Sequence, residues 1–212
     1  MKLISSPASP FVRKVRVVLH ETGLAAQVTE VPVATTALTP AAEARAANPT
    51  AKIPALVLAD GRAIYDSRVI TRYLDDLAGA GLYPQGEALW DVLTLEALAD
   101  GLLEAAVLMV YEARLRPPAQ QSPDWIAAQW AKVEGALDAL ETGWIAHLDG
   151  AHREGAHREG ALTAGHVAVG CACGYLDFRH GARNWRDGRD RLAQWYERFA
   201  ARPAMQATQP AG

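Results

Sequence analysis

A short stretch rich in glycine and proline separates two regions of this sequence that follow different periodic patterns. The stretch contains Gly79, Gly81, Pro84 and Gly86, residues typical of linkers and turns. Before it, apolar runs of strand length alternate with helical runs, whereas every strong periodic signal after it is helical. We therefore predict two domains, a mixed α/β domain at 1–80 and an all-helical domain at 87–212.

The first region is predicted to have the element order βαβαββα. The expected elements are strand 2–5, a helix from Pro10 to Gly23, strand 27–33, helix 40–47, strands 55–58 and 62–65, and a helix that starts at Asp66-Ser67. Ser9 suits the N-cap of the first helix, and Pro10 suits its first position. Asp60-Gly61 is typical of a two-residue hairpin turn.

The second region is predicted to contain long helices that each bury one apolar face. One runs from about Ala88 to Arg114, the next opens at Ser122-Pro123, and the two are expected to form an antiparallel pair. A later helix starts after Thr163, which can cap it, and a last helix covers roughly 189–202.

Charge and composition argue against several classes of partner. The 21 Lys and Arg residues and 24 Asp and Glu residues are spread along the chain, so no part offers the basic surface that nucleic acid requires. No window has about 18 uninterrupted apolar residues, and the first residues do not form a signal peptide. We expect a soluble cytoplasmic protein with no membrane partner, in which Cys171 and Cys173 are small core residues.

Residues 151–155 and 156–160 are both Ala-His-Arg-Glu-Gly. A polar, glycine-containing repeat of this length is expected to be an exposed loop. His152 and His157 lie five residues apart in it, and a flexible segment does not preorganise metal ligands. We expect no native metal site there.

Three motifs of the first region, in their order and spacing, resemble the cytosolic glutathione S-transferase family. Ser-Pro-Phe-Val-Arg-Lys-Val-Arg at 9–16 resembles the family's first strand-to-helix turn, and 48–56 resembles the loop that leads to its cis-proline. Asp66-Ser67 resembles the acidic-Ser pair that holds the γ-glutamyl end of glutathione. Residues 163–178 and Arg202-Pro203 resemble the later helices. The Ser-Pro-Phe turn is most similar to bacterial members related to the beta, zeta and omega groups.

The resemblance implies a fold, an activity and a set of site residues. The fold is an α/β thioredoxin-like N-terminal domain followed by an all-α C-terminal domain, and glutathione is a co-substrate of a detoxifying transferase that forms a homodimer. Ser9 is expected next to the glutathione sulfur. The residues expected to bind glutathione are Phe11, Lys52, Ile53, Pro54, Asp66 and Ser67. The residues expected to line a second-substrate pocket are Leu103, Val107, Tyr111 and Arg114 of the long helix.

The Ser9 hydroxyl can stabilise a glutathione thiolate. A free thiol has a pKa of about 8.5, and lowering it by about 2 units requires roughly 2.7 kcal/mol. A charge-assisted hydrogen bond supplies about 1.5–3 kcal/mol, and a helix N-terminus adds about 0.3–1 kcal/mol. Ser5 and Ser6 remain alternative donors. Ser6 and Ser9 stand where thioredoxin-like oxidoreductases carry a Cys-x-x-Cys pair, so no mixed disulfide forms at this turn.

Three functions remain open at this point. The first is conjugation of glutathione to small electrophiles. The second is a non-catalytic scaffold of the same fold that binds a protein partner, and the third is a glutathione-dependent isomerase of maleyl acids. One departure from the family is also visible: many members have an Asp three residues after the capping Thr163, where this chain has His166. We expect the altered capping box to lose about 1 kcal/mol locally.

Overall fold

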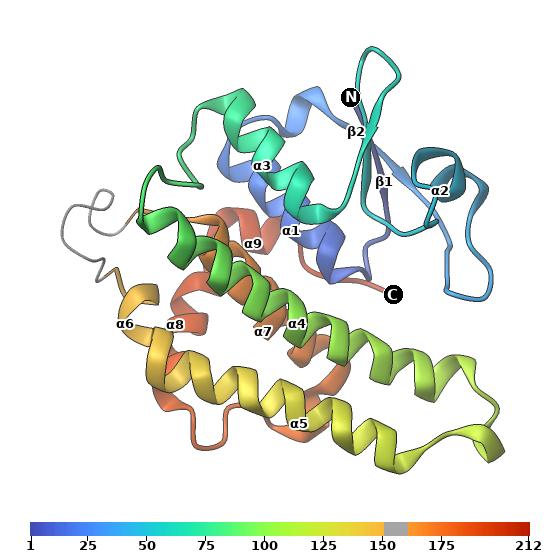
Figure 1. Ribbon diagram of the computed structural model, residues 1–212, viewed down its shortest axis with the longest axis vertical. Helices are drawn as coiled ribbons and strands as arrows, with labels where there is room; N and C mark the ends of the chain where they lie inside the picture. The colour runs from blue at the N-terminus through green and yellow to red at the C-terminus, as the bar shows by residue number, and fades with distance from the viewer. Residues whose placement is uncertain (151–160) are drawn as a thin grey trace. The chain divides into compact units, whose positions relative to one another are not determined.

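The computed structural model describes residues 1–150 and 161–212, which form two compact units (Figure 1). Unit 1 comprises Met1–Tyr83 and Arg202–Gly212, and unit 2 comprises Pro84–Ala201. The Ala-His-Arg-Glu-Gly repeat, with the loop and the histidines discussed above, lies outside the described residues.

Unit 1 is built on a four-stranded mixed sheet with the strand order β2-β1-β3-β4. Its elements before the linker are β1 (Lys2–Ser5), α1 (Pro10–Glu21), a 3-10 turn (Ala25–Gln27), β2 (Thr29–Pro32), α2 (Ala42–Ala47), β3 (Ala55–Val57), β4 (Ala63–Ile64) and α3 (Ser67–Ala78). β1 pairs in parallel with β2 and antiparallel with β3, which pairs antiparallel with β4. The predicted order βαβαββα is confirmed.

Helices cover both faces of this sheet because its strands carry apolar residues on both sides. Ile4 and Ala55 are cross-strand partners and pack with α2 on one face. Their neighbours Leu3 and Leu56 are also paired and are fully buried, and successive strand residues point to opposite faces. α1 and α3 pack together on that second face. The result is a three-layer unit with α2 on one side and α1 and α3 on the other.

The β3–β4 hairpin forms as predicted, but its turn is longer than predicted. The Leu58 N–H donates to the carbonyl of Arg62 at 2.8 Å, which leaves three residues in the loop instead of two. Gly61 adopts a φ of 87°, and the Asp60 side chain accepts from the Arg62 N–H at 3.0 Å. A three-residue hairpin loop needs a residue in the left-handed region, which glycine supplies at little steric cost.

Residues 202–212 pack with unit 1, although the sequence analysis assigned them to the helical domain. The last predicted helix, 189–202, is two helices: α8 (Asp190–Ala200) belongs to unit 2, and α9 (Pro203–Ala207) packs on α1. Pro203 opens α9 because proline lacks the N–H that a continuing helix would use.

Unit 2 is entirely helical. Its elements are α4 (Ala88–Leu115), a 3-10 turn (Pro118–Gln120), α5 (Pro123–Ala139), a π-helical turn (Leu140–Trp144), α6 (Ile145–Leu148), α7 (Ala164–His180), a second 3-10 turn (Gly181–Arg183) and α8. α4 and α5 lie side by side and run in opposite directions, as predicted (Figure 1). Within the described part of the chain, no helix has the length and apolar character needed to cross a membrane.

α7 is the most deeply buried helix of unit 2, and small residues let its neighbours approach closely. Gly165 faces Leu95 of α4, and Gly170 faces the ring of Phe199 of α8. Cys171 and Cys173 are fully buried and form no disulfide, as expected for small core residues. Burial raises the pKa of the Cys173 thiol, so the reactive thiolate is disfavoured there.

The capping box at the start of α7 is complete, so the expectation that His166 alters it is wrong. The Thr163 N–H donates to His166 Nδ1 at 3.2 Å, and Thr163 Oγ1 lies 2.7 Å from the same nitrogen. The Thr163 side chain also accepts from the backbone of His166. An imidazole nitrogen is an acceptor with a reach similar to that of a short carboxylate, so His166 performs the role for which we expected an acidic residue.

Replacing His166 tests this capping box. His166→Ala removes the acceptor for the buried Thr163 N–H and is expected to reduce the free energy of unfolding by about 1 kcal/mol. His166→Asp restores an acceptor and is expected to lose less. Denaturant titration of both variants measures the difference; equal stability of His166→Ala and the unaltered protein would contradict a capping role.

Gly170 tests the close approach of α7 and α8. A methyl group added in Gly170→Ala meets the Phe199 ring, and overpacking of this kind is expected to lower the free energy of unfolding by about 1–3 kcal/mol. Gly101 of α4 is a matched control because a Cβ there meets nothing within 4 Å. Gly101→Ala is expected to stabilise by up to about 1 kcal/mol, and chemical denaturation distinguishes the two signs.

Candidate glutathione site

Strand pairing brings the three sequence motifs to one edge of the sheet in unit 1. β1 and β4 run in the same direction, and β3 runs opposite to both. The C-terminal ends of β1 and β4 therefore lie at the same edge of the sheet as the N-terminal end of β3. The segment after β1 carries Ser9, the segment before β3 carries Pro54, and the segment after β4 carries Asp66 and Ser67.

Ser9 is the N-cap of α1. Its backbone is extended, with φ −83° and ψ 122°, and its Oγ accepts from the Val12 N–H at 3.3 Å. Pro10 occupies the first helical position, where a missing N–H leaves no helical bond unmade. A hydroxyl has one donor and two acceptor positions. Capping uses an acceptor position, so the O–H of Ser9 can still donate to an anion at the helix N-terminus.

The other two serines of this turn have different surroundings. Ser5 is the last residue of β1 and is buried, and the carbonyl of Ser6 accepts from the Ser9 N–H at 3.1 Å. Ser6 thus braces the turn through its backbone. Of the three serines, Ser9 is the one that caps α1, and its assignment as the sulfur-binding residue remains a proposal.

The loop before β3 is shaped by one buried side chain. Asn48 donates from Nδ2 to the carbonyl of Lys52 at 3.0 Å, and its Oδ1 accepts from the N–H and the hydroxyl of Thr50 at 3.0 and 2.9 Å. The Ile53–Pro54 peptide bond is cis, as the resemblance implies. Pro54 is buried and Ile53 half-buried, while the Lys52 side chain is exposed.

Asp66 and Ser67 form the N-terminus of α3. Asp66 is the N-cap, and its Oδ1 accepts from the Arg68 N–H at 3.0 Å. Its Oδ2 lies 3.1 Å from Nη2 of Arg68. Burial favours the protonated acid, but the hydrogen bond and charge of Arg68 outweigh it, with a smaller contribution from Lys14, so the pKa of Asp66 is lowered. Asp66 is therefore an anion at neutral pH.

The Ser67 side chain is buried next to this cap but is not used by the fold. Ser67 is only 3% exposed, and its carbonyl accepts from the Thr71 hydroxyl at 2.9 Å. Its own hydroxyl has no hydrogen-bond partner among the residues that the structure describes. The first N–H groups of a helix are also without intrahelical partners. A hydroxyl and helix amides at one terminus are suited to a carboxylate.

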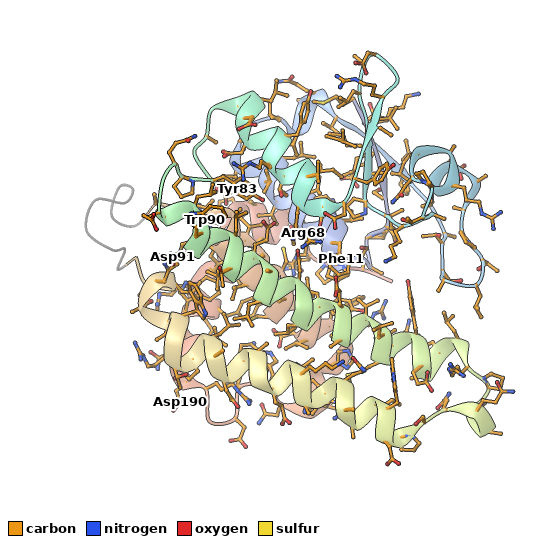
Figure 2. All side chains as sticks on the ribbon, in the orientation of Figure 1. Phe11, Arg68, Tyr83, Trp90, Asp91 and Asp190 are labelled. Carbon is orange, nitrogen blue, oxygen red and sulfur yellow. The ribbon has the colours of Figure 1, made fainter. Side chains whose placement is uncertain are left out.

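Three basic residues near this edge were not identified from the sequence. Arg13 and Lys14 of α1 are 6% and 1% exposed, and Arg68 pairs with Asp66. Figure 2 shows Phe11 on α1 and Arg68 on α3. Cationic side chains are almost never this buried without a partner. The sequence signal that could have identified Arg13 and Lys14 is their position between apolar residues of a predicted helix.

The four residues proposed for the second substrate all lie on α4 in unit 2. Leu103 is fully buried and Val107 half-buried, whereas Tyr111 and Arg114 are exposed. Tyr111 is 36% exposed, and partial burial of the rest of its side chain raises the pKa of its hydroxyl, which stays protonated at neutral pH. Glu112, the acid nearest Arg114 in sequence, is already bound to Arg116 at 2.8 Å and to the Ser122 N–H at 3.0 Å.

Residues 1–150 and 161–212 contain no group of three or more His, Cys, Asp or Glu side chains that is placed to hold a metal ion. The groups described at the candidate site are hydrogen-bond donors, acceptors and charges at two helix N-termini and one loop.

Family models agree with this arrangement. The N-terminal domain of glutathione S-transferases matches residues 8–77, and the C-terminal domain of glutathione S-transferases matches residues 123–198. The chain belongs to the glutathione S-transferase family.

Individual relatives span the whole chain. The uncharacterized GST-like protein YibF of Escherichia coli is 34% identical over 99% of this chain and 98% of its own length. A glutathione transferase family member from Pseudomonas fluorescens, crystallised with bound glutathione, is 43% identical with a TM-score of 0.91 and covers 100% of this chain and 99% of that one. A second crystal structure from that organism contains S-(propanoic acid)-glutathione, with 42% identity, a TM-score of 0.87 and full coverage of both chains.

Asp66→Asn tests the charge at the α3 N-terminus separately from the cap. Asn caps helices as well as Asp, so the free energy of unfolding is expected to change by less than about 1 kcal/mol. Retention on immobilised glutathione is expected to weaken roughly tenfold, because Asp66 is expected to pair with the ammonium of the ligand and the substitution removes its charge. The matched control is Asp60→Asn, since Asp60 is also an exposed aspartate paired with an arginine, Arg62, at 2.6 Å. Equal weakening by both substitutions would contradict a specific role for Asp66.

Proposed function

We propose that this chain is a glutathione S-transferase that joins glutathione to small electrophiles, with the Ser9 hydroxyl stabilising the glutathione thiolate. The observation that carries the proposal is the convergence of two capped helix N-termini and the Pro54 loop at one edge of the sheet. Glutathione bears two carboxylates, an ammonium and a thiol, and this edge offers a complementary group for each.

In this proposal, each end of glutathione has its own binding group. The γ-glutamyl carboxylate accepts from the Ser67 hydroxyl and amide at the α3 N-terminus, and its ammonium pairs with Asp66. The backbone of Ile53, next to Pro54, pairs with the cysteinyl backbone as an added strand. Exposed Lys52 reaches the glycyl carboxylate, and Phe11 packs beside the ligand.

Ser9 acts on the sulfur without forming a bond to the substrate. The thiol releases its proton to solvent, the Ser9 O–H donates to the resulting thiolate, and the sulfur lone pair attacks the electrophilic carbon. The hydrogen bond favours the anion by about 1.5–3 kcal/mol, and the α1 N-terminus adds about 0.3–1 kcal/mol. The thiolate is the nucleophile, so a lower thiol pKa raises the reactive fraction at neutral pH.

The acceptor in this proposal is a small electrophile that bears a carboxylate. The relative from Pseudomonas fluorescens binds a glutathione whose sulfur carries propanoic acid, a conjugate of that kind. On α4 of this chain, Tyr111 and Arg114 offer a hydroxyl and a guanidinium, groups that bind carboxylates well. Half-buried Val107 supplies apolar surface, whereas Leu103 is fully buried and has none to offer a ligand. Glu112, the acid nearest Arg114 in sequence, pairs with Arg116. This supports an anionic acceptor as the partner of Arg114.

The proposed setting is a cytoplasmic homodimer with a role in detoxification. Several large apolar side chains are exposed in the single chain, among them Val69 and Leu77 on α3 and Trp90, 62% exposed, at the start of α4. Apolar surface of this kind supports contact with a second copy. The cytoplasm is where a reduced glutathione pool is maintained.

Removal of the Ser9 hydroxyl tests the proposal. Ser9→Gly is the sharpest variant, because glycine at an N-cap costs only a few tenths of a kcal/mol while Ala costs about 1. Conjugation of an aryl halide is expected to fall about ten- to hundredfold, with retention on immobilised glutathione preserved. Ser6→Ala, in the same turn, is the control and is expected to retain activity.

The outcomes separate the remaining functions. Failure of the unaltered protein to bind immobilised glutathione would overturn the proposal. Binding without conjugation of any electrophile would instead favour the scaffold function, and turnover of maleyl acids without net consumption of glutathione would favour the isomerase. Loss of activity in Ser6→Ala but not in Ser9→Gly would move the role to Ser6.

A further inference from the structure

Residues 202–212 are anchored at two places to α1 and at a third to the turn that precedes α1; we call this segment the strap. Arg202 forms a two-point ion pair with Glu21, with both N–O distances 2.9 Å. The Met205 carbonyl accepts from Nη2 of Arg13 at 3.1 Å. The Ala211 N–H donates to the Pro7 carbonyl at 3.4 Å. The anchors thus extend from the last turn of α1 to the residue two positions before Ser9.

Arg13 connects the strap to the Ser9 turn, because its backbone bonds to the turn and its side chain bonds to the strap. Its backbone N–H donates to the Ser9 carbonyl at 3.0 Å, as the first helical bond of α1. Its guanidinium is bound to the strap at Met205. A displacement of the strap therefore acts on the residue that holds the Ser9 carbonyl, while the Ala211 contact acts on the same turn from its other side.

The burial of Arg13 shows that this connection is costly to maintain. Its side chain is 6% exposed, and its Nε has no hydrogen-bond partner in the described part of the chain. An unmet buried donor costs about 1–3 kcal/mol. A leucine or methionine at this position of α1 would fill the same space without that cost, so packing alone does not account for an arginine here.

We propose that Arg13 is a positioning residue, and that the strap it binds fixes the direction in which the Ser9 hydroxyl points. This inference rests on the proposed function of Ser9. A hydrogen bond weakens steeply when its angle departs from linearity. The Ser9 Oγ already accepts from the Val12 N–H, and its one proton is the group that would donate to the thiolate. A small rotation of the turn therefore weakens the bond to the thiolate without removing the glutathione site at Asp66 and Ser67.

The test loosens the strap at points that do not touch glutathione. Glu21→Gln weakens the ion pair with Arg202, and Ala211→Pro removes the amide that binds Pro7, with Ala211→Ser as its partner variant that keeps the amide. Glu30→Gln is the matched control, because Glu30 of β2 pairs at 2.8 Å with another α1 arginine, Arg16, and not with an arginine of the strap. Arg13→Met removes the central link.

The readout is the pH dependence of the ultraviolet absorbance of enzyme-bound glutathione thiolate, together with the pH profile of kcat. In Glu21→Gln and Ala211→Pro, the pH at which half of the bound glutathione is thiolate is expected to rise by about half a unit. Below this midpoint, that rise means about threefold less thiolate. Arg13→Met is expected to show a larger rise. The KM for glutathione is expected to stay within about twofold in all of them, and Glu30→Gln and Ala211→Ser are expected to match the unaltered protein.

The result separates this inference from the proposed function. One outcome is that the unaltered protein lowers the midpoint of the bound thiol below that of free glutathione, while Glu21→Gln and Ala211→Pro have the same midpoint as the unaltered protein. In that case the inference is wrong and the role of Ser9 stands. If the unaltered protein leaves the thiol at its solution midpoint, both are wrong. A parallel rise in KM and midpoint would show general damage to the site and would also overturn a positioning role.

Discussion

The antiparallel pairing of β3 with both β1 and β4 is the constraint on which the rest of unit 1 depends. β3 has three residues and β4 two, and together with β1 they set the directions in which the chain leaves the sheet. Because β1 and β4 end at the edge where β3 begins, the N-termini of α1 and α3 and the Pro54 loop meet there. A shift of one residue in this register would exchange the two faces of the strand and separate Ile4 from α2.

The same polar groups hold the fold together and supply the chemistry of the candidate site. Ser9 and Asp66 each cap a helix, and each keeps bonding capacity that the cap does not use: a hydroxyl proton on Ser9 and carboxylate lone pairs on Asp66. A helix N-terminus is a favourable place for an anion because its first amides are unpaired. Capping and ligand binding therefore need no separate residues at this edge, and Ser67 adds a buried hydroxyl that the fold leaves unused.

Unit 2 shows that the geometry of an acceptor matters more than its residue type. His166 completes the capping box of α7, because its Nδ1 reaches the Thr163 N–H from the third helical position. We expected an acidic residue to complete this box, and the imidazole instead supplies the lone pair that accepts from the Thr163 N–H at 3.2 Å. Close packing around Gly165 and Gly170 likewise depends on which side chains of α4 and α8 face them.

The sequence by itself determined the features that depend on residues a few positions apart. The order βαβαββα, the caps at Ser9 and Asp66, the hairpin at Gly61 and the long helices after the linker are set by propensities, turns and periodicity. It did not determine the length of the hairpin turn or the packing of residues 202–212. The Arg13 to Met205 hydrogen bond joins residues 192 positions apart, and no local pattern encodes such a contact. Only the tertiary structure decided it, because burial of an arginine against α9 depends on where the whole chain places that helix.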